Sequence, residues 1–319
     1  MAKLFQTKIS ESGITLPVVA VYAALLWIVA GLIPAGLYLQ FALFALTAAL
    51  MMELNNRHAL LRIRSRMVSV SFIIIGCMAN FMFADTVACI TGLGTAVMLT
   101  LLFMQYHDSM SRGYTFYTFA AIGLVSLLWV QVLFFVPLIW LLMLFCIQNM
   151  SRLSFAASLI GIIAPYWFAG AYFFFIGDFD TPMTHIMQLT EFEPIGASYG
   201  NIGLNQIVTL AMITALAITG AVHYVRKSYN DKIHNRMLYN CFMWLNAAAL
   251  LFIILQPQHY NKLIAMMTVF TSPLVAHFVA LTKTRWTNIA TIAIATVVLI
   301  ITIFNLWTPS LIFSQATDI

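Results

Sequence analysis

Four arginines lie in a short polar interval between two long apolar stretches: Arg57, Arg62, Arg64 and Arg66. A guanidinium group binds phosphate through two parallel hydrogen bonds, so this cluster could bind a lipid headgroup or a lipid-linked precursor. The alternative is that cytosolic loops are basic because their charge fixes the orientation of the neighbouring spans. Topology alone requires such charges, so the alternative is favoured. The same holds for the basic segment 226–236, where Asp231 supplies a local partner.

Three carboxylates are the candidate catalytic groups. Asp85 lies in a very short link between two apolar stretches, and Glu191 and Glu193 would share one side of an extended chain. Carboxylates at an outer membrane face could act as the general base in glycosyl transfer from a polyprenyl-phosphate-linked donor, or hold a divalent cation. The alternative is that the glutamates are solvated loop charges and that Asp85 caps a helix beginning at Thr86. The spacing does not fix the distances between these groups, so the alternative is favoured.

Histidines and cysteines give little support to a metal site. Four histidines are predicted near one membrane face: His58, His107, His223 and His277. None has a second histidine at the H-x-x-H, H-x-x-x-H or H-E-x-x-H spacing that lets one helix present two metal ligands. We expect His223 and His277 to hydrogen-bond to neighbouring helices or to lie at the interface. All four cysteines lie in apolar stretches without a C-x-x-C pair. The sequence predicts no metal site and no cofactor.

These groups belong to a chain of 319 residues that is 62% apolar and 8% charged, with a mean hydropathy of +0.95. An ordinary soluble domain is about 45–50% apolar and about 25% charged, so a soluble enzyme is excluded. The net charge of +5 is no sign of nucleic-acid binding, because the basic residues occupy short gaps between apolar runs. The sequence predicts a multi-pass membrane protein in contact with membrane lipids.

Apolar runs predict an all-α bundle of about eleven transmembrane spans within a single membrane domain, 1–319. One crossing takes about 20 residues. The predicted spans are 15–35, 39–54, 67–84, 86–105, 114–131, 132–148, 155–176, 205–225, 240–255, 262–282 and 287–307. Two divisions are open: the stretch 15–54 is predicted to break near Pro34 and Gly36, and the halves of 114–148 could each cross or be re-entrant. Ten or nine spans are the fallback.

Charge distribution favours two crossings within 114–148. With two, 14 of the 15 lysines and arginines fall on one side and only Lys262 on the other, whereas one crossing divides them 8 against 7. Positive residues gather on the cytosolic side, so the N-terminus is predicted to be cytosolic and the C-terminus external. The long loop 177–204 is then external. Its glycines and prolines argue against regular structure, and its aromatics suggest that it folds back onto the membrane surface.

Polar residues inside the predicted spans are few, among them Asn80, Gln131, Asn246 and Asn305, and no lysine or arginine lies at mid-span. Ion-coupled carriers place ionisable residues at that depth, so an active carrier is disfavoured.

Seven short segments follow one another along the chain: Leu54–Asn56, Arg62–Met67, Phe83–Thr86, Pro165–Phe168, Ser228–Lys232, Gln256–His259 and Ser272–Leu274. In this order they resemble a family of uncharacterised polytopic integral membrane proteins of Bacteroidota, which carry a domain of unknown function. The resemblance extends from about residue 50 to Pro309. It implies an all-helical fold in the inner membrane of a Gram-negative cell, and it implies no activity.

Three functions from different classes are consistent with the sequence. The first is a non-catalytic component of the cell envelope that assembles with other envelope proteins or lipids. The second is a membrane glycosyltransferase or polymerase that acts on a lipid-linked sugar at the outer face. The third is a carrier for a small molecule or lipid. The absence of catalytic motifs favours the first.

Overall fold

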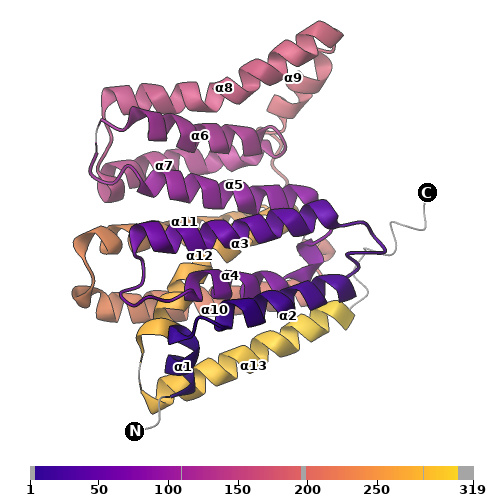
Figure 1. The fold of residues 1–319 in the computed structure, drawn as a ribbon. Coiled ribbons are helices and arrows are strands. Elements are labelled where there is room, and N and C mark those ends of the chain that lie inside the picture. The colour runs from indigo at the N-terminus through magenta and orange to yellow at the C-terminus, as the bar shows by residue number, and fades with distance from the viewer. Residues whose placement is uncertain (1–3, 109, 195–198, 283, 308–319) are drawn as a thin grey trace. The chain divides into compact units, whose positions relative to one another are not determined.

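The computed structural model of the chain describes residues 4–108, 110–194, 199–282 and 284–307, and these residues form helices and no strands (Figure 1). The predicted all-α fold is therefore confirmed. Among these residues, eight helical segments are long and apolar enough to cross a membrane, or nine if one sharply bent pair forms a single span. The count of eleven spans and the orientation of the termini stay predictions. The C-terminal residues 308–319, predicted to be external, lie outside the described residues.

The chain divides into two compact units. Unit 1 comprises the described parts of Met1–Gly92 and Tyr199–Ile319, and unit 2 comprises those of Leu93–Ser198. The division falls within one helix, α5 (Thr86–Phe103). The single membrane domain over 1–319 stays a prediction.

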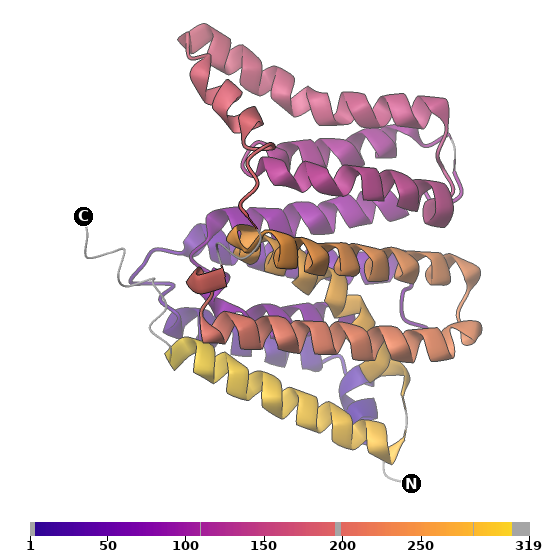
Figure 2. The ribbon, with the colours of Figure 1, turned by 180° about the vertical axis from the view of Figure 1, so that it is seen from behind.

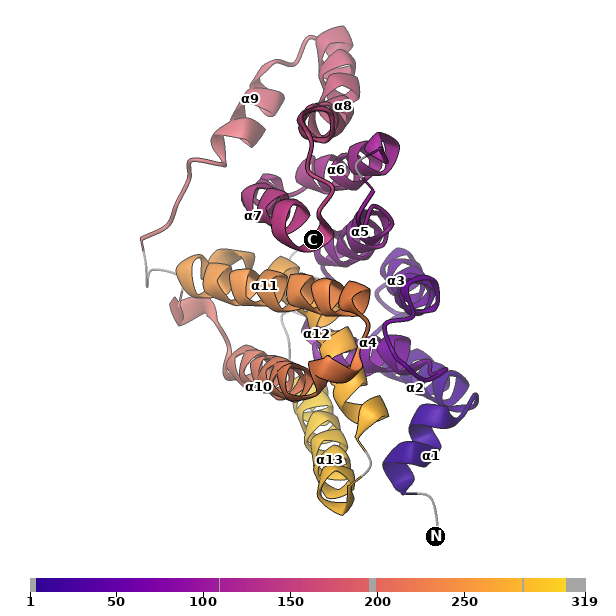
Figure 3. The same cartoon turned by 90° about the vertical axis from the view of Figure 1, so that its left-hand side faces the viewer.

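Unit 1 is built around one helix, α12. Its helices are α1 (Phe5–Glu11), α2 (Thr15–Val29), α3 (Tyr38–His58), α4 (Met67–Met78), the start of α5, α10 (Leu204–Lys227), α11 (Ile233–Leu255), α12 (Tyr260–Leu281) and α13 (Arg285–Trp307). In the most apolar stretch of the segment Pro257–Leu281, which contains α12, 94% of the residues are buried. The cause is that α4, α10 and α11 all pack against α12 (Figure 3). From behind, α13 lies beside α10 (Figure 2). The core of unit 1 therefore surrounds α12.

The predicted break within 15–54 is confirmed. Helix α2 ends at Val29 and α3 begins at Tyr38, and the link between them contains two left-handed glycines, Gly31 and Gly36, with φ of +102° and +64°. Such φ values strain residues other than glycine. Shortly before this link, in α2, the indole of Trp27 stacks on the ring of Phe83 with a centroid distance of 3.7 Å.

Unit 2 contains the end of α5, α6 (Arg112–Ser126), η2 (Val130–Phe135), α7 (Val136–Leu142), η3 (Met143–Ile147), α8 (Arg152–Ile176) and α9 (Asp180–Met187). The division of 114–148 into two halves is confirmed, because α6 ends at Ser126 and a second helical run begins at Val130. Helices α6 and α8 lie side by side (Figures 1 and 2). Gly123 and Gly161 allow this close approach, since a Cβ on either would lie within 3 Å of the other helix's backbone.

The loop 177–204 is more regular than the sequence suggested, because it contains helix α9. The carboxylate of Asp178 accepts hydrogen bonds from the backbone N–H groups of Asp180 and Thr181 and from the Thr181 hydroxyl. These bonds cap the first turn and hold the pKa of Asp178 below its usual value. The loop also contacts its own unit, because the ring of Phe192 lies 5.6 Å from that of Phe134. Its folding onto the membrane surface stays a prediction. Residues 195–198 of this loop lie outside the described part.

Two helices extend well beyond the predicted spans. Helix α11 begins at Ile233 rather than near residue 240, and α3 continues to His58 rather than ending at 54. Hydropathy locates only the apolar part of a helix, whose length suits the bilayer. Backbone hydrogen bonding continues the helix into the polar residues on either side of that part. Asn55 and Asn235 on these extensions are buried, and both hold the link between α3 and α4.

Gly220 on α10 allows that helix to approach α12 closely. A Cβ at this position would lie 2.7 Å from the backbone carbonyl of Leu274 and 2.8 Å from the Leu274 Cβ. Backbone atoms cannot yield as a flexible side chain would. His223 and His277 lie one turn further along the two helices, so the same close approach brings the imidazoles together.

Replacing Gly220 with alanine should lower the free energy of unfolding by about 1–3 kcal/mol, the usual cost of inserting a methyl group into a packed interface. Sodium dodecyl sulfate titration of the purified protein measures this change. Gly170 on α8 is the matched control, because a Cβ there meets nothing within 4 Å. Gly170→Ala should leave stability unchanged or raise it by under about 1 kcal/mol. Equal effects at both glycines would contradict the close-packing role of Gly220.

Candidate functional site

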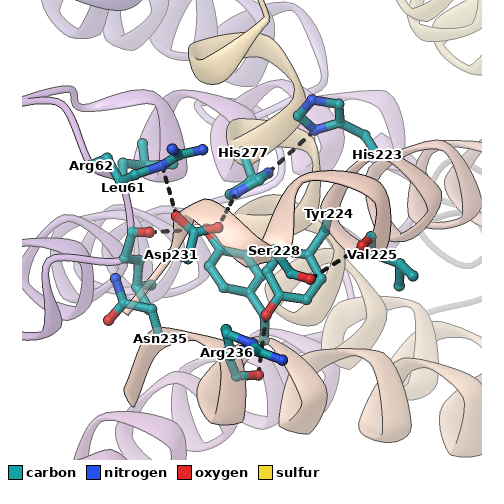
Figure 4. A network of polar contacts seen from close by, with 12 residues as sticks. Leu61, Arg62, His223, Tyr224, Val225, Ser228, Asp231, Asn235, Arg236 and His277 are labelled. Carbon is teal, nitrogen blue, oxygen red and sulfur yellow. Dashed lines mark hydrogen bonds and ion pairs between the residues drawn. The ribbon is translucent and has the colours of Figure 1, made fainter. Parts of the chain in front are cut away.

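A buried carboxylate is the centre of a polar network at one end of unit 1 (Figure 4). Asp231 lies in the link between α10 and α11, and its side chain is completely buried. The Nε atom of Arg62, from the link between α3 and α4, lies 2.7 Å from Asp231 Oδ1. The Arg62 side chain is 36% exposed. The ion pair therefore joins a buried anion to a cation that still reaches the surface.

Two histidines extend the network from Asp231. His277 Nε2 lies 3.1 Å from Asp231 Oδ2, and His277 Nδ1 lies 3.3 Å from His223 Nδ1 (Figure 4). One of the two facing Nδ1 atoms must donate and the other must accept. With both imidazoles neutral, one tautomer pair satisfies both contacts: His277 donates from Nε2 to the carboxylate, and His223 donates from Nδ1 to His277.

The link that carries Arg62 is fixed by two asparagines. Helix α3 ends at His58, and the φ of +46° at the next residue, Ala59, turns the chain sharply. The Asn55 amide donates to the carbonyl of Ser65 at 2.8 Å, and its Oδ1 accepts from the backbone N–H of Leu61. Asn235, on α11, donates to the carbonyl of Ala59 at 2.7 Å. The position of Arg62 therefore follows from local bonds as well as from its ion pair.

Aromatic rings surround His277. The rings of Tyr224 and Tyr239 stack with a centroid distance of 4.6 Å, and each meets the imidazole of His277 edge to face, at 5.2 and 5.1 Å. Both tyrosines and His277 are buried. The Tyr239 hydroxyl donates to the carbonyl of Leu60. These rings exclude water from the carboxylate, which strengthens its interaction with Arg62 and raises the cost of breaking it.

The hydroxyl groups of Ser228 and Tyr224 in this network are bonded to backbone carbonyls. The hydroxyl of Ser228 donates to the carbonyl of Val225 at 3.1 Å, and that of Tyr224 to the carbonyl of Arg236, so neither points to an imidazole. Activation of a nucleophile requires a hydrogen bond to the general base. In the described part of the chain, no group of three or more His, Cys, Asp or Glu residues is arranged to hold a metal ion.

The four predicted phosphate-binding arginines have different surroundings. Arg57 pairs with Glu53 on the exposed face of α3, with 2.5 Å between Nε and Oε1. Arg62 pairs with Asp231. Arg64 and Arg66 are exposed, and neither has an ion-pair partner among the described residues. Phosphate binding by this cluster stays a prediction.

The three candidate catalytic carboxylates belong to different units. Asp85, in unit 1, accepts a hydrogen bond from the backbone N–H of Ala88 at 2.9 Å and from the Asn261 amide at 3.4 Å. It therefore acts as the cap of α5, as the alternative interpretation expected. In unit 2, Glu191 is exposed and Glu193 is half-buried. A catalytic role for these three residues stays a prediction.

Only part of this network can be predicted from the sequence. The predicted hydrogen bonding of His223 and His277 to neighbouring helices is confirmed. The sequence predicts a local basic partner for Asp231, but its ion-pair partner is the distant Arg62. A signal was available: Asp231 is the one acidic residue in a strongly basic segment, and such a residue often has a specific partner.

None of the protein-family models, characterised proteins or solved structures with which the chain was compared matches it.

Replacing Asp231 with leucine should lower the free energy of unfolding by about 2 kcal/mol. A fully buried pair costs about 3–5 kcal/mol when one partner is removed, and the loss is smaller here because Arg62 can turn to water. The control is Glu53→Leu, which breaks the exposed pair with Arg57 and should cost under about 0.5 kcal/mol. Chemical unfolding in detergent compares the two variants. If Glu53→Leu is as harmful as Asp231→Leu, the network is not what stabilises this end of unit 1.

Proposed function

We propose that the chain is a non-catalytic component of a bacterial inner membrane that serves as a rigid assembly partner for other envelope molecules. The observation that supports this proposal is the network at Asp231. It joins the α3–α4 link, the α10–α11 link and α12 through buried polar contacts. A helical bundle whose helix ends are joined in this way keeps one shape. A fixed shape suits a protein whose surface other molecules recognise.

The exposed residues around the network indicate what kind of molecule would bind there. They are Arg64, Arg66, Arg226, Lys227, Lys232 and Arg236, and we call them the cationic rim. The only acidic residue in the two links that carry Asp231 and Arg62 is Asp231 itself, which is buried and paired. The rim is therefore complementary to an acidic segment of an envelope protein or to anionic headgroups.

A carrier is less well supported, because the polar residues inside its helices bind one another. The amide of Asn80 donates to the carbonyl of Thr302 at 3.1 Å, and that of Asn246 to the Thr271 hydroxyl at 2.6 Å. Both asparagines are buried. Alternating access needs polar groups that line a cavity and ends that open. The paired asparagines and the joined helix ends favour a fixed structure instead.

Location in the inner membrane, with the cationic rim in the cytosol, is part of the proposal and rests on the uneven distribution of charge. Arg226 and Glu191 are both exposed and suit labelling. In a background without the four native cysteines, Glu191→Cys should react with a membrane-impermeant maleimide added to cells with a permeabilised outer membrane. Arg226→Cys should react only after the inner membrane is broken. Labelling of Arg226→Cys before lysis would reverse the orientation.

Complementation separates the assembly function from catalysis. In cells that lack the protein, the triple variant Asp85→Asn, Glu191→Gln, Glu193→Gln should restore resistance to detergent stress as well as wild type does. The rim variant Arg64→Gln, Arg66→Gln, Arg226→Gln, Lys227→Gln should not, although most cations that fix orientation remain. Membrane level and maleimide labelling of each variant serve as controls. Loss of function in the triple variant with normal function in the rim variant would instead support the glycosyltransferase.

A further inference from the structure

A cavity of about 500 Å³ lies within unit 1 beside α1. Its walls come mainly from α1, α2, α4, α12 and α13, and most of the side chains that line it are aliphatic, among them Val18, Ile74 and Val279. Its volume falls within the range of about 300–1,000 Å³ that is typical of small-molecule sites. Apolar cavities accept apolar ligands. The lining therefore points to a hydrocarbon chain.

One cation lines the cavity. Helix α1 bends 90° away from α2 (Figure 1) and contributes Lys8 to the lining, and Ser12 lies just past the end of this helix. Lys8 is exposed, and its ammonium group has no ion-pair partner within the described residues. A hydrocarbon-lined cavity with a lysine in its wall is complementary to an amphiphile with a negatively charged head.

The position of Lys8 is fixed by its neighbour Gln6. The buried amide of Gln6 donates to the carbonyl of Val279 at 2.7 Å and to the hydroxyl of Thr282. The backbone N–H of Gln6 donates to the Asn288 side chain at 2.9 Å. These contacts hold α1 where α12 ends and α13 begins. His277 lies near the same end of α12, so Lys8 and the cationic rim share the end of unit 1 that the charge distribution predicts to be cytosolic.

We propose that this cavity binds one acyl chain of an anionic phospholipid, with the headgroup phosphate at Lys8. The cytosolic leaflet carries anionic lipids, and basic pockets between helices on that side suit their headgroups. The site is separate from the cationic rim, and it does not require the assembly function proposed above.

Native mass spectrometry of the purified full-length protein tests the site with three probes: dioleoyl phosphatidylglycerol, dioleoyl phosphatidylcholine and oleic acid. Val18→Trp fills the cavity, and Val21→Trp is its control, because Val21 is equally exposed on α2 but does not line the cavity. Lys8→Gln removes the charge, and Arg152→Gln is its control, because Arg152 is an exposed cation of unit 2 that belongs neither to the cavity nor to the cationic rim. Thermal unfolding of each variant checks its fold, and the Lys8 and Arg152 pair decides the result if Val18→Trp is unstable.

The wild type should bind phosphatidylglycerol at least fivefold more tightly than phosphatidylcholine. Lys8→Gln should weaken phosphatidylglycerol binding about fivefold, as expected for one lysine near a membrane surface. Val18→Trp should weaken it at least tenfold, and both controls should stay within twofold of wild type. The proposal is overturned if Val18→Trp matches Val21→Trp, if Lys8→Gln binds phosphatidylglycerol as wild type does, if oleic acid binds more tightly than phosphatidylglycerol, or if no probe binds.

Discussion

Unit 1 depends on how one buried negative charge is compensated. Taking a carboxylate out of water costs several kcal/mol unless the surrounding atoms replace its hydration. For Asp231, Arg62 replaces water at one carboxylate oxygen and His277 replaces it at the other. Because these partners come from separate links and helices, the carboxylate can be satisfied only when α3, α4, α10, α11 and α12 are all in place. One charge thereby selects a single packing arrangement for helices whose apolar surfaces alone would tolerate several.

Close helix packing and the polar network depend on each other. Gly220 removes the side chain that would hold α10 away from α12, and the imidazoles of His223 and His277 then meet one turn further on. In a bilayer, lipid tails compete with every apolar contact between helices, so small residues and hydrogen bonds are what distinguish one interface from another. The α6–α8 pair in unit 2 combines the small residues Gly123 and Gly161 with a hydrogen bond from the Tyr166 hydroxyl to the Ser126 carbonyl. The α10–α12 pair likewise combines a small residue, Gly220, with hydrogen bonding.

Local features of this fold could be predicted from the sequence, and long-range features could not. Hydropathy located the helices, and Gly36 and Pro34 marked the break between α2 and α3. Asp85 could be recognised as a helix cap because its partner, Ala88, is three residues away. By contrast, Asn235 and Ala59 are bonded across 176 positions, and no spacing rule relates such residues. The ion pair between Arg62 and Asp231 is equally outside any spacing rule, and phosphate binding by Arg62 stays a prediction.

The contacts of Gln6 have a consequence for the order in which the chain matures. Gln6 is bonded to Val279 and Asn288, which lie 273 and 282 positions later. During translation, α1 leaves the ribosome long before these partners exist, so its contacts can form only after α12 and the start of α13 have been synthesised. The wall that α1 contributes to the apolar cavity is therefore among the last parts of unit 1 to form, and the cavity reaches its final shape only when most of the chain is present.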